Sequence, residues 1–126
     1  MANHIKIAII EDDSVIAQMY RMKFEAEGFE VQTAENGAVG VELVKDMQPD
    51  VALVDVRMPV MDGPTAIKKV RELKGKQPIV IVLTNVGEEE APEELHKLNV
   101  HSYIVKAEST PREVTEHVKE ALARKK

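Results

Sequence analysis

The sequence has no cysteine and no tryptophan, and aromatic residues make up only 3% of its 126 residues. Without cysteine the chain can form no disulfide, which favours a reducing compartment. The scarcity of aromatic side chains argues against a surface on which bases stack. Basic residues are also the minority, with 17 lysines and arginines against 22 acidic residues and a net charge of −5. Because a nucleic-acid-binding domain usually carries a basic patch, we expect no direct contact with nucleic acid.

Long apolar runs are missing as well. The longest, such as residues 79–83, are far shorter than the ~20 residues that a membrane-spanning helix needs. Residues 1–6 contain no apolar signal region. A chain of 126 residues has the usual size of one domain. We therefore expect a single acidic, globular, cytoplasmic domain over residues 1–126 that does not contact a membrane.

Short apolar runs alternate with longer amphipathic stretches along the whole chain. The runs predict five strands, at residues 5–10, 29–33, 51–54, 79–83 and 102–105. A helical pattern follows each strand, and the fourth and least defined lies near residues 92–98. Strands that alternate with helices predict a parallel sheet, and strands that are apolar on both faces predict helices on both sides. The predicted fold class is α/β, with a doubly wound five-stranded parallel sheet.

Two of the predicted helices carry further local signals. The first has two adjacent apolar stripes at helical spacing, namely Val15, Met19 and Met22, and Ile16, Tyr20 and Phe24. Gly28 follows this helix, where a left-handed residue commonly stands. The last helix begins at residues 110–113 (TPRE), a capping-box pattern with proline in the first turn.

Charged or hydroxyl-bearing residues follow four of the five strands: Glu11, Asp12 and Asp13, then Asp55, Thr84 and Lys106. Because functional sites in such sheets lie outside the carboxyl ends of the strands, we expect these side chains to converge. Two carboxylates ~4 Å apart repel each other by ~1 kcal/mol in water and by ~4 kcal/mol at an effective dielectric constant of 20. A cation would relieve this repulsion, and a ligand set made only of oxygen favours Mg²⁺.

A metal-held carboxylate beside a hydroxyl and an ammonium group suits phosphoryl transfer. Asp55 can act as the nucleophile and form an aspartyl phosphate, with Mg²⁺ neutralising the developing charge. Thr84 can donate a hydrogen bond to one phosphoryl oxygen, and Lys106 can place a positive charge beside another. Each residue also has a structural interpretation: Thr84 can simply end a strand, Lys106 can be a solvated lysine, and Asp13 is most simply a helix cap.

Four segments give the sequence a recognisable pattern: residues 9–13 (IIEDD), 55–63 (DVRMPVMDG), 83–84 (LT) and 102–106 (SYIVK). Each segment is weak evidence alone, but their order and spacing together are specific. From end to end the chain resembles the receiver domains of two-component response regulators, in particular the single-domain chemotaxis regulators. The resemblance implies a flavodoxin-like (βα)5 fold with strand order 2-1-3-4-5, and a single domain over residues 1–126 with no output domain.

The resemblance also implies a phosphoacceptor and its metal ligands. Asp55 resembles the phosphoacceptor. Asp12 would bind Mg²⁺ directly, and Glu11 would bind it through water. The backbone carbonyl of Arg57 would be the third protein ligand, beside Asp12 and Asp55.

The remaining implied roles concern catalysis and signalling. Lys106 resembles the lysine of the family's site, and Thr84 and Tyr103 resemble its switch pair, in which the hydroxyl moves toward the phosphoryl group and the ring turns inward. The implied donor is a histidine kinase or a histidine phosphotransfer protein. A downstream protein partner would bind the face formed by the fourth helix, fifth strand and fifth helix. The chain would be a monomer or a weak phosphorylation-dependent dimer, catalysing only its own phosphoryl transfer and dephosphorylation.

Three positions depart from the common pattern of this family. Ala107 stands where the family usually has a proline preceded by a cis bond; because a cis bond before a non-proline residue costs ~2.5–4 kcal/mol, we expect a trans bond and a rearranged loop. Asn85 stands where a very small residue is usual, and is expected to narrow the path to Asp55. Arg57 is a long cation that can reach a phosphoryl group on Asp55 or shield it from water.

Three other functions compete with this interpretation. A receiver-like binding module that is never phosphorylated is disfavoured by the intact set of Asp12, Asp55, Thr84 and Lys106. A phosphatase with an aspartyl nucleophile commonly carries an aspartate two residues later as general acid, and that position is Arg57 here. A nucleotide- or flavin-binding fold would need a glycine-rich phosphate loop after the first strand, which here leads into acidic residues.

Overall fold

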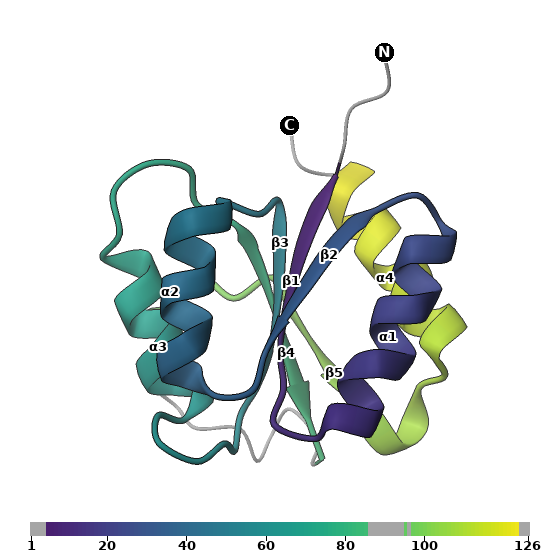
Figure 1. Ribbon diagram of the computed structural model, residues 1–126, viewed down its shortest axis with the longest axis horizontal. Helices are drawn as coiled ribbons and strands as arrows, with labels where there is room; N and C mark the ends of the chain where they lie inside the picture. Colours follow the sequence, from purple (N-terminus) through teal and green to yellow (C-terminus); the bar gives the residue numbers. More distant parts are fainter. Residues whose placement is uncertain (1–4, 86–94, 96, 124–126) are drawn as a thin grey trace.

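The computed structural model describes residues 5–85, 95 and 97–123 of the chain (Figure 1). The helix predicted near residues 92–98 lies largely outside these described residues. None of the helices described is long and apolar enough to cross a membrane. The strands are β1 (Lys6–Ile10), β2 (Glu30–Ala34), β3 (Val51–Asp55), β4 (Ile79–Thr84) and β5 (Ser102–Val105); the α-helices are α1 (Ser14–Ala26), α2 (Gly37–Met47), α3 (Gly63–Arg71) and α4 (Pro111–Ala123), and the 3-10 turn η3 spans Lys106–Glu108.

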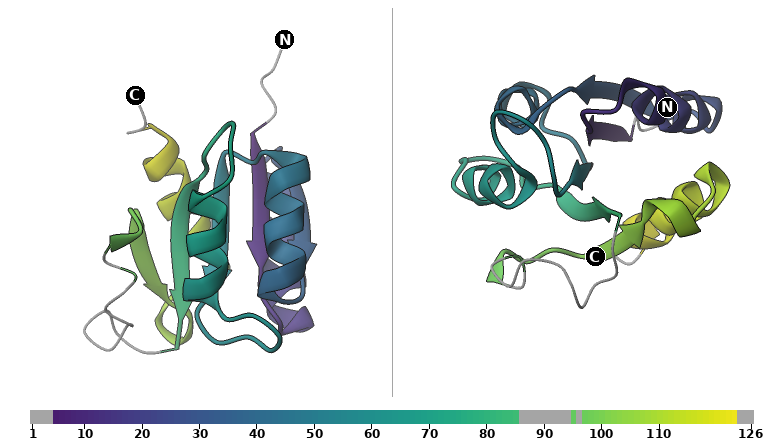
Figure 2. Two further views of the ribbon diagram at one scale, coloured as in Figure 1. Left: turned by 90° about the vertical axis from the view of Figure 1, so that its left-hand side faces the viewer. Right: turned by 90° about the horizontal axis from the view of Figure 1, so that it is seen from below.

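All five strands pair in parallel in the order β2-β1-β3-β4-β5, which confirms the predicted sheet. Helices α1 and α4 cover one face of the sheet, and α2 and α3 cover the other (Figures 1 and 2). β3 and β4 each run one residue further than predicted. Asp55 and Thr84 are therefore the last residues of strands rather than the first residues of loops, and Asp55 lies beside Leu83 in the ladder.

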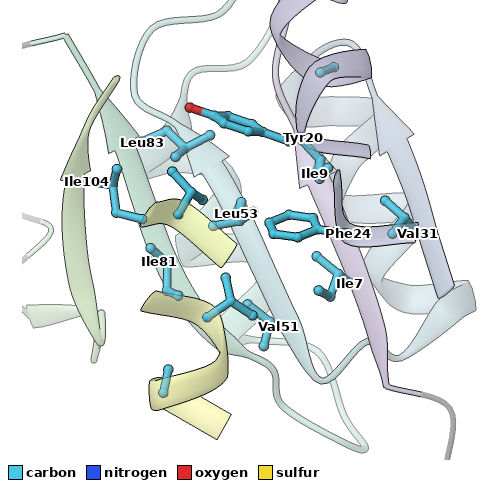
Figure 3. Packing of buried hydrophobic residues seen from close by; sticks show 14 residues of the cluster. Ile7, Ile9, Tyr20, Phe24, Val31, Val51, Leu53, Ile81, Leu83 and Ile104 are labelled. Carbon is cyan, nitrogen blue, oxygen red and sulfur yellow. The ribbon is translucent and has the colours of Figure 1, made fainter. Parts of the chain in front are cut away.

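Each face of the sheet has its own apolar cluster, because alternate strand residues point to opposite faces. Ile7 and Ile9 pack with Phe24 beneath α1 and α4 (Figure 3). Ala8 and Ile10, the alternate residues of the same strand, pack beneath α2 and α3. Burying one large aliphatic side chain stabilises a fold by ~1.5–3 kcal/mol. The sheet is therefore held between two apolar layers, which leaves its carboxyl edge free for polar residues.

Helix α1 shows which of its two apolar stripes belongs to the core. Tyr20 and Phe24 are buried, and their rings lie 6.4 Å apart. The neighbouring stripe faces solvent, since Val15, Met19 and Met22 are 71%, 45% and 68% exposed. Helical spacing identifies both stripes, but only the position of the sheet decides between them.

Local signals at the helix ends act as predicted. Gly28 has a φ of 93°, the left-handed conformation expected after α1. The backbone N–H of Thr110 donates to Glu113 Oε1 at 2.9 Å, and the N–H of Glu113 donates to Thr110 Oγ1 at 3.1 Å, so the capping box before α4 is confirmed. The Lys106–Ala107 peptide bond is trans, as expected, and the chain turns into η3 there.

Two glycines fix the loop between β3 and α3 at the carboxyl edge of the sheet. The N–H of Gly63 donates to the carbonyl oxygen of Val56 at 2.8 Å, and a Cβ at position 63 would overlap the carbonyl oxygen of Asp55. The N–H of Gly37, at the start of α2, donates to the carbonyl oxygen of Met61 at 3.1 Å. The missing side chains let the loop pack against β3 and α2, which holds the backbone that carries Asp55.

Candidate functional site

Polar residues from four strands meet at the carboxyl edge of the sheet, as the sequence predicts. Asp55 ends β3 and Thr84 ends β4, while Glu11 directly follows β1 and Lys106 directly follows β5. Glu11, Asp55 and Thr84 are 2%, 4% and 2% exposed. Burying a polar group lowers stability unless the group is hydrogen-bonded or paired with an opposite charge. Apolar packing therefore does not account for three buried polar side chains at this edge.

Three carboxylates form an acidic cluster at this edge. Glu11, Asp12 and Asp55 each place one carboxylate oxygen within 4.8 Å of the others. Glu11 and Asp55 are buried, whereas Asp12 is exposed. The cluster is therefore closed on the side of the sheet and open to solvent through Asp12.

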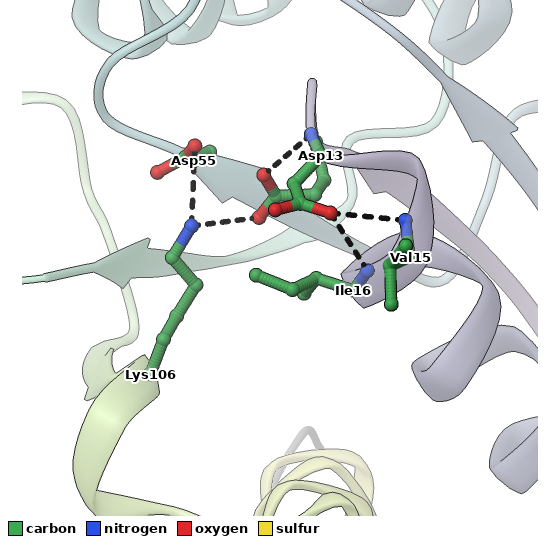
Figure 4. Close-up of polar contacts among 6 residues, drawn as sticks. Asp13, Val15, Ile16, Asp55 and Lys106 are labelled. Atoms are coloured by element: carbon green, nitrogen blue, oxygen red, sulfur yellow. Dashed lines mark hydrogen bonds and ion pairs between the residues drawn. The ribbon is translucent and has the colours of Figure 1, made fainter.

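Lys106 pairs with both buried carboxylates of the acidic cluster (Figure 4). Its Nζ atom lies 2.9 Å from Glu11 Oε1 and 3.3 Å from Asp55 Oδ2. The other oxygen of Glu11, Oε2, accepts a hydrogen bond from the backbone N–H of Asp13 at 3.0 Å. Because these contacts use both oxygens of Glu11, that carboxylate is held in one orientation and positions Lys106 beside Asp55.

Burial changes the proton affinity of the groups in the site. Burial, and after it the charge of Glu11, raise the pKa of the Asp55 carboxyl to about 7, although Lys106 acts in the opposite direction. Burial alone would lower the pKa of Lys106, but the hydrogen bond from Lys106 to Glu11 and the charges of Glu11 and Asp55 outweigh it, so this pKa is raised. Lys106 is therefore charged at neutral pH. At the same pH the charged and the neutral forms of the Asp55 carboxyl are about equally populated.

The donor set of the acidic cluster fits a hard divalent cation. Three carboxylate oxygens converge from two strand ends, and all the ligand atoms are oxygen. The single ammonium group of Lys106 compensates only part of the charge of three carboxylates. A cation at the open side, beside Asp12, would offset the remainder.

The carboxylate of Asp13 caps a helix, and the side chain of Arg57 is exposed. Asp13 is the cap of α1, since its Oδ1 atom accepts hydrogen bonds from the backbone N–H groups of Val15 at 2.9 Å and Ile16 at 3.1 Å (Figure 4). This confirms the structural interpretation of Asp13. The side chain of Arg57 is exposed, in the loop that follows β3.

The two residues of the predicted switch pair lie on the neighbouring strands β4 and β5, two positions apart in the register. Thr84 is buried at the end of β4, in register with Val105 of β5. Tyr103 is half-buried and packs against the apolar cluster beneath α2 and α3. Asn85, which follows Thr84, is exposed.

Tyr20 shares the electrostatic environment of the site, although the sequence predicts it only as a core residue. Burial raises the pKa of its hydroxyl; the charge of Lys106 lowers it, and those of Glu11 and Asp55 raise it. Helical spacing correctly identifies the burial of Tyr20 but cannot tell in which direction its hydroxyl points. The charges of the site therefore act on a residue of α1, a helix that contributes no predicted site residue.

Comparison with known proteins relates this geometry to a family. The family model of the response regulator receiver domain matches residues 7–119. The chain is 38% identical over 119 residues to the transcriptional regulatory protein SrrA of Staphylococcus aureus (strain NCTC 8325 / PS 47), a match that covers 94% of this chain and 48% of SrrA. It is 36% identical over 101 residues to the regulatory protein AtoC of Escherichia coli (strain K12), covering 80% of this chain and 22% of AtoC. The chain thus spans less than half the length of these two curated relatives.

Solved structures share the architecture over nearly their full lengths. A CheY-like response regulator receiver domain protein from Methanospirillum hungatei JF-1 has a TM-score of 0.87 and 26% identity, over 96% of this chain and 95% of that one. The chemotaxis protein CheY4 of Vibrio cholerae has a TM-score of 0.85 and 26% identity, over 94% of this chain and 98% of that one. With the family model matching most of the chain, the protein belongs to the receiver domains of two-component response regulators.

Proposed function

We propose that the protein is a phosphorylation-dependent signalling switch that accepts a phosphoryl group on Asp55. The donor is a histidine kinase or a histidine phosphotransfer protein. The observation that carries this proposal is the position of Lys106 Nζ, 2.9 Å from Glu11 and 3.3 Å from Asp55 in a buried acidic cluster. This contact keeps a positive charge beside the oxygen that would attack.

Asp55 supplies the nucleophile in this proposal. An oxygen of its carboxylate attacks the phosphorus atom of the donor's phosphohistidine, and the P–N bond breaks with its electron pair remaining on the donor's ring nitrogen. The new P–O bond makes Asp55 an acyl phosphate, and no proton has to leave the carboxylate in this step. Lys106 compensates the charge of one phosphoryl oxygen, and the hydroxyl of Thr84 donates a hydrogen bond to another.

Glu11, Asp12 and Asp55 would hold Mg²⁺ together with the backbone carbonyl of Arg57. Asp12 would bind the ion directly and Glu11 through water. The support is an all-oxygen donor set whose atoms lie within 4.8 Å of one another. When bound, Mg²⁺ supplies positive charge that neutralises the phosphoryl oxygens in the transition state.

The signal leaves the site through the switch pair. The hydroxyl of Thr84 moves toward the phosphoryl group, and the ring of Tyr103 packs inward against the apolar cluster beneath α2 and α3. In this structure the ring of Tyr103 already packs against that cluster, so the proposed switch also requires an outward position of the ring. A downstream protein partner then binds the face formed by β5, α4 and the helix predicted near residues 92–98.

Intact-mass spectrometry after incubation with Mg²⁺ and acetyl phosphate tests the phosphoacceptor. We expect the wild-type chain to gain one base-labile phosphoryl group and Asp55→Asn to gain none. Asp46→Asn, which removes an exposed carboxylate of α2, is the matched control and should be phosphorylated like the wild type. Phosphorylation of Asp55→Asn to the wild-type extent would contradict the assignment of Asp55.

A receiver-like module that signals without phosphorylation is the alternative outcome of this experiment. In that case the wild-type chain gains no mass, and NMR spectra recorded with Mg²⁺ and beryllofluoride show no change around Asp55. The proposed switch instead predicts chemical-shift changes that extend from Asp55 to Thr84 and Tyr103.

A further inference from the structure

Two histidines converge on one hydroxyl at the end of β5 that lies away from Lys106. His101 Nδ1 lies 2.9 Å from Ser102 Oγ, and the same oxygen lies 2.6 Å from His117 Nε2 of α4. The two imidazole rings are 6.2 Å apart between centroids and nearly perpendicular, at 86°. Two ring nitrogens, one from the residue before β5 and one from α4, therefore lie close to a single oxygen atom.

The backbone holds both histidines in place. The N–H of His101 donates to the carbonyl oxygen of Val80 at 2.8 Å, which ties this residue to the start of β4. His117 lies within α4, next to the fully buried Val118 that anchors this helix to the sheet. Because a backbone hydrogen bond holds His101 and α4 holds His117, only the rings and the hydroxyl have to adjust for the nitrogens to approach each other.

The surroundings of His117 are acidic and open to solvent. A hollow of about 600 Å³ beside it is lined by Glu113, Glu116, Lys119 and Glu120. Burial and the neighbouring His101 lower the pKa of His117, while Glu120 acts in the opposite direction. The hollow therefore places three carboxylates and one ammonium group beside the ring of His117.

We propose that His101 and His117 form a binding site for a late first-row divalent cation such as Zn²⁺, with Glu120 and water completing the coordination. Neutral imidazole suits Zn²⁺, Ni²⁺ and Cu²⁺, whereas Mg²⁺ prefers oxygen ligands. A Zn–N bond is about 2.0–2.1 Å long, so a bound ion requires the Ser102 hydroxyl to rotate away and the two nitrogens to come together around the ion. Glu120 lies three residues after His117 on α4, a spacing that places both side chains on one helix face.

This site is separate from the acidic cluster in both position and chemistry. The acidic cluster lies at the carboxyl edge of the sheet and offers only oxygen. The histidine pair instead joins His101, the residue before β5, to the middle of α4. The site does not depend on the phosphorylation of Asp55. A bound ion would cross-link the start of β5 to the middle of α4.

The test is isothermal titration of the whole chain with Zn²⁺ in excess Mg²⁺, which occupies the acidic cluster. We expect one Zn²⁺ per chain, with binding weakened at least tenfold in His101→Gln and in His117→Gln. His96→Gln is the matched control and should bind like the wild type. Unchanged binding in either of the first two variants, or an equal loss in the control, would overturn the proposal.

Ser102→Ala distinguishes a metal site from a purely structural contact. If the hydroxyl competes with the ion for the two nitrogens, Ser102→Ala should bind Zn²⁺ at least as tightly as the wild type. Loss of Zn²⁺ binding in Ser102→Ala would refute the two-nitrogen site. Circular dichroism confirms that each variant is folded, and Glu120→Gln, expected to weaken binding less than either histidine variant, keeps the test informative if a histidine variant does not fold.

Discussion

At the residue scale, the site depends on the way in which burial and charge act on a few side chains. Lys106 is the clearest case, since it contacts the carboxylates of Glu11, which follows β1, and Asp55, which ends β3. The cost of burying Asp55 close to Glu11 appears as its pKa, which is raised to about 7. A charge arrangement that is unfavourable for folding is thereby kept where a cation and a phosphoryl group are proposed to bind.

Asp55→Asn should stabilise the metal-free protein. The pKa of Asp55 in the folded state, about 7, lies above that of an unfolded aspartate. The stability that the protonated Asp55 carboxyl gives to the folded state is therefore complete below about pH 4 and is lost as the pH rises through 7. We expect Asp55→Asn to raise the free energy of unfolding by about 1–4 kcal/mol near pH 8 and by much less near pH 5.

Urea denaturation at both pH values, without divalent ions, measures this effect. Asp46→Asn removes an exposed carboxylate and serves as the control for the change in net charge. A gain for Asp55→Asn near pH 8 that is no larger than the gain for Asp46→Asn would show that burial of Asp55 carries no cost.

Asn85→Ala should accelerate phosphorylation severalfold. Asn85 directly follows Thr84 and is exposed, so its side chain is expected to narrow the approach to Asp55. The measurement is the time course of mass gain with acetyl phosphate and Mg²⁺. Asn85→Gln, which keeps the amide and adds length, should be no faster than the wild type, and equal rates for all three proteins would remove the steric argument.

At the element scale, the sheet decides which apolar stripe of a helix is buried, although the stripes look equivalent in the sequence. α1 buries Tyr20 and Phe24, while Met19 and Met22 face solvent. α3 is tied to distant segments by Arg71, whose guanidinium donates to the carbonyl oxygens of Leu98 and Asn99, both at 2.8 Å. Periodicity predicts that these helices exist, but the contacts that orient them come from residues far away in the chain.

Substitutions in the two stripes of α1 should differ strongly in their effect on stability. Phe24 is fully buried, so Phe24→Ala is expected to lower the free energy of unfolding by about 3–5 kcal/mol. Met22 is 68% exposed, so Met22→Ala should change it by less than about 0.5 kcal/mol. Urea denaturation of both variants provides the comparison, and similar losses would mean that the exposed stripe is covered in solution.

Arg71→Lys should destabilise the protein although it keeps the charge. The guanidinium of Arg71 also donates from Nη1 to Gln77 Oε1 at 2.8 Å and to the carbonyl oxygen of Pro78 at 3.1 Å. A lysine cannot reproduce this planar set of donors, and each hydrogen bond lost from these partly buried acceptors costs about 1 kcal/mol. Thermal unfolding measures the loss.

Arg21→Lys is the matched control for Arg71→Lys. Arg21 forms an exposed ion pair with Glu25 on α1, and such pairs contribute little. Its replacement by lysine should change stability by less than about 0.5 kcal/mol. Equal effects at both positions would mean that the contacts of Arg71 are not needed to hold α3.

At the scale of the whole molecule, the two apolar clusters share one sheet. Tyr20 belongs to the cluster beneath α1 and α4, and Tyr103 packs against the cluster beneath α2 and α3. The chain has no tryptophan and only two tyrosines, so each tyrosine reports on one face. Because the same strands contribute side chains to both clusters, unfolding of one cluster should expose the other to solvent.

The two faces should therefore unfold in a single cooperative transition. Tyrosine fluorescence of Tyr103→Phe follows the Tyr20 face, and that of Tyr20→Phe follows the Tyr103 face. In each variant the fluorescence transition in urea should coincide with the far-ultraviolet circular dichroism of the same variant. A midpoint that differs between the two probes would mean that one layer opens while the other stays folded.

Much of this molecule follows from local patterns in the sequence. Apolar runs predict five parallel strands, and the limits of β3 and β4 are missed by one residue because a buried aspartate or threonine looks like the start of a loop. The Asp13 cap and the Thr110–Glu113 capping box depend on residues only three apart. The order of the strands was predicted through the resemblance to a family and is confirmed by the sheet.

The sequence by itself determined the α/β class, the parallel sheet and the residues at its carboxyl edge. These features depend on the alternation of strands and helices and on helix caps, which involve residues close together in the chain. Only the tertiary structure decided which stripe of α1 is buried, that Tyr20 lies beside the charges of the site, and that Lys106 pairs with both Glu11 and Asp55. It also decided that Ser102 and His117, 15 positions apart, share a hydrogen bond. Such contacts join residues distant in the chain, and their distances are set by the packing of all the layers at once.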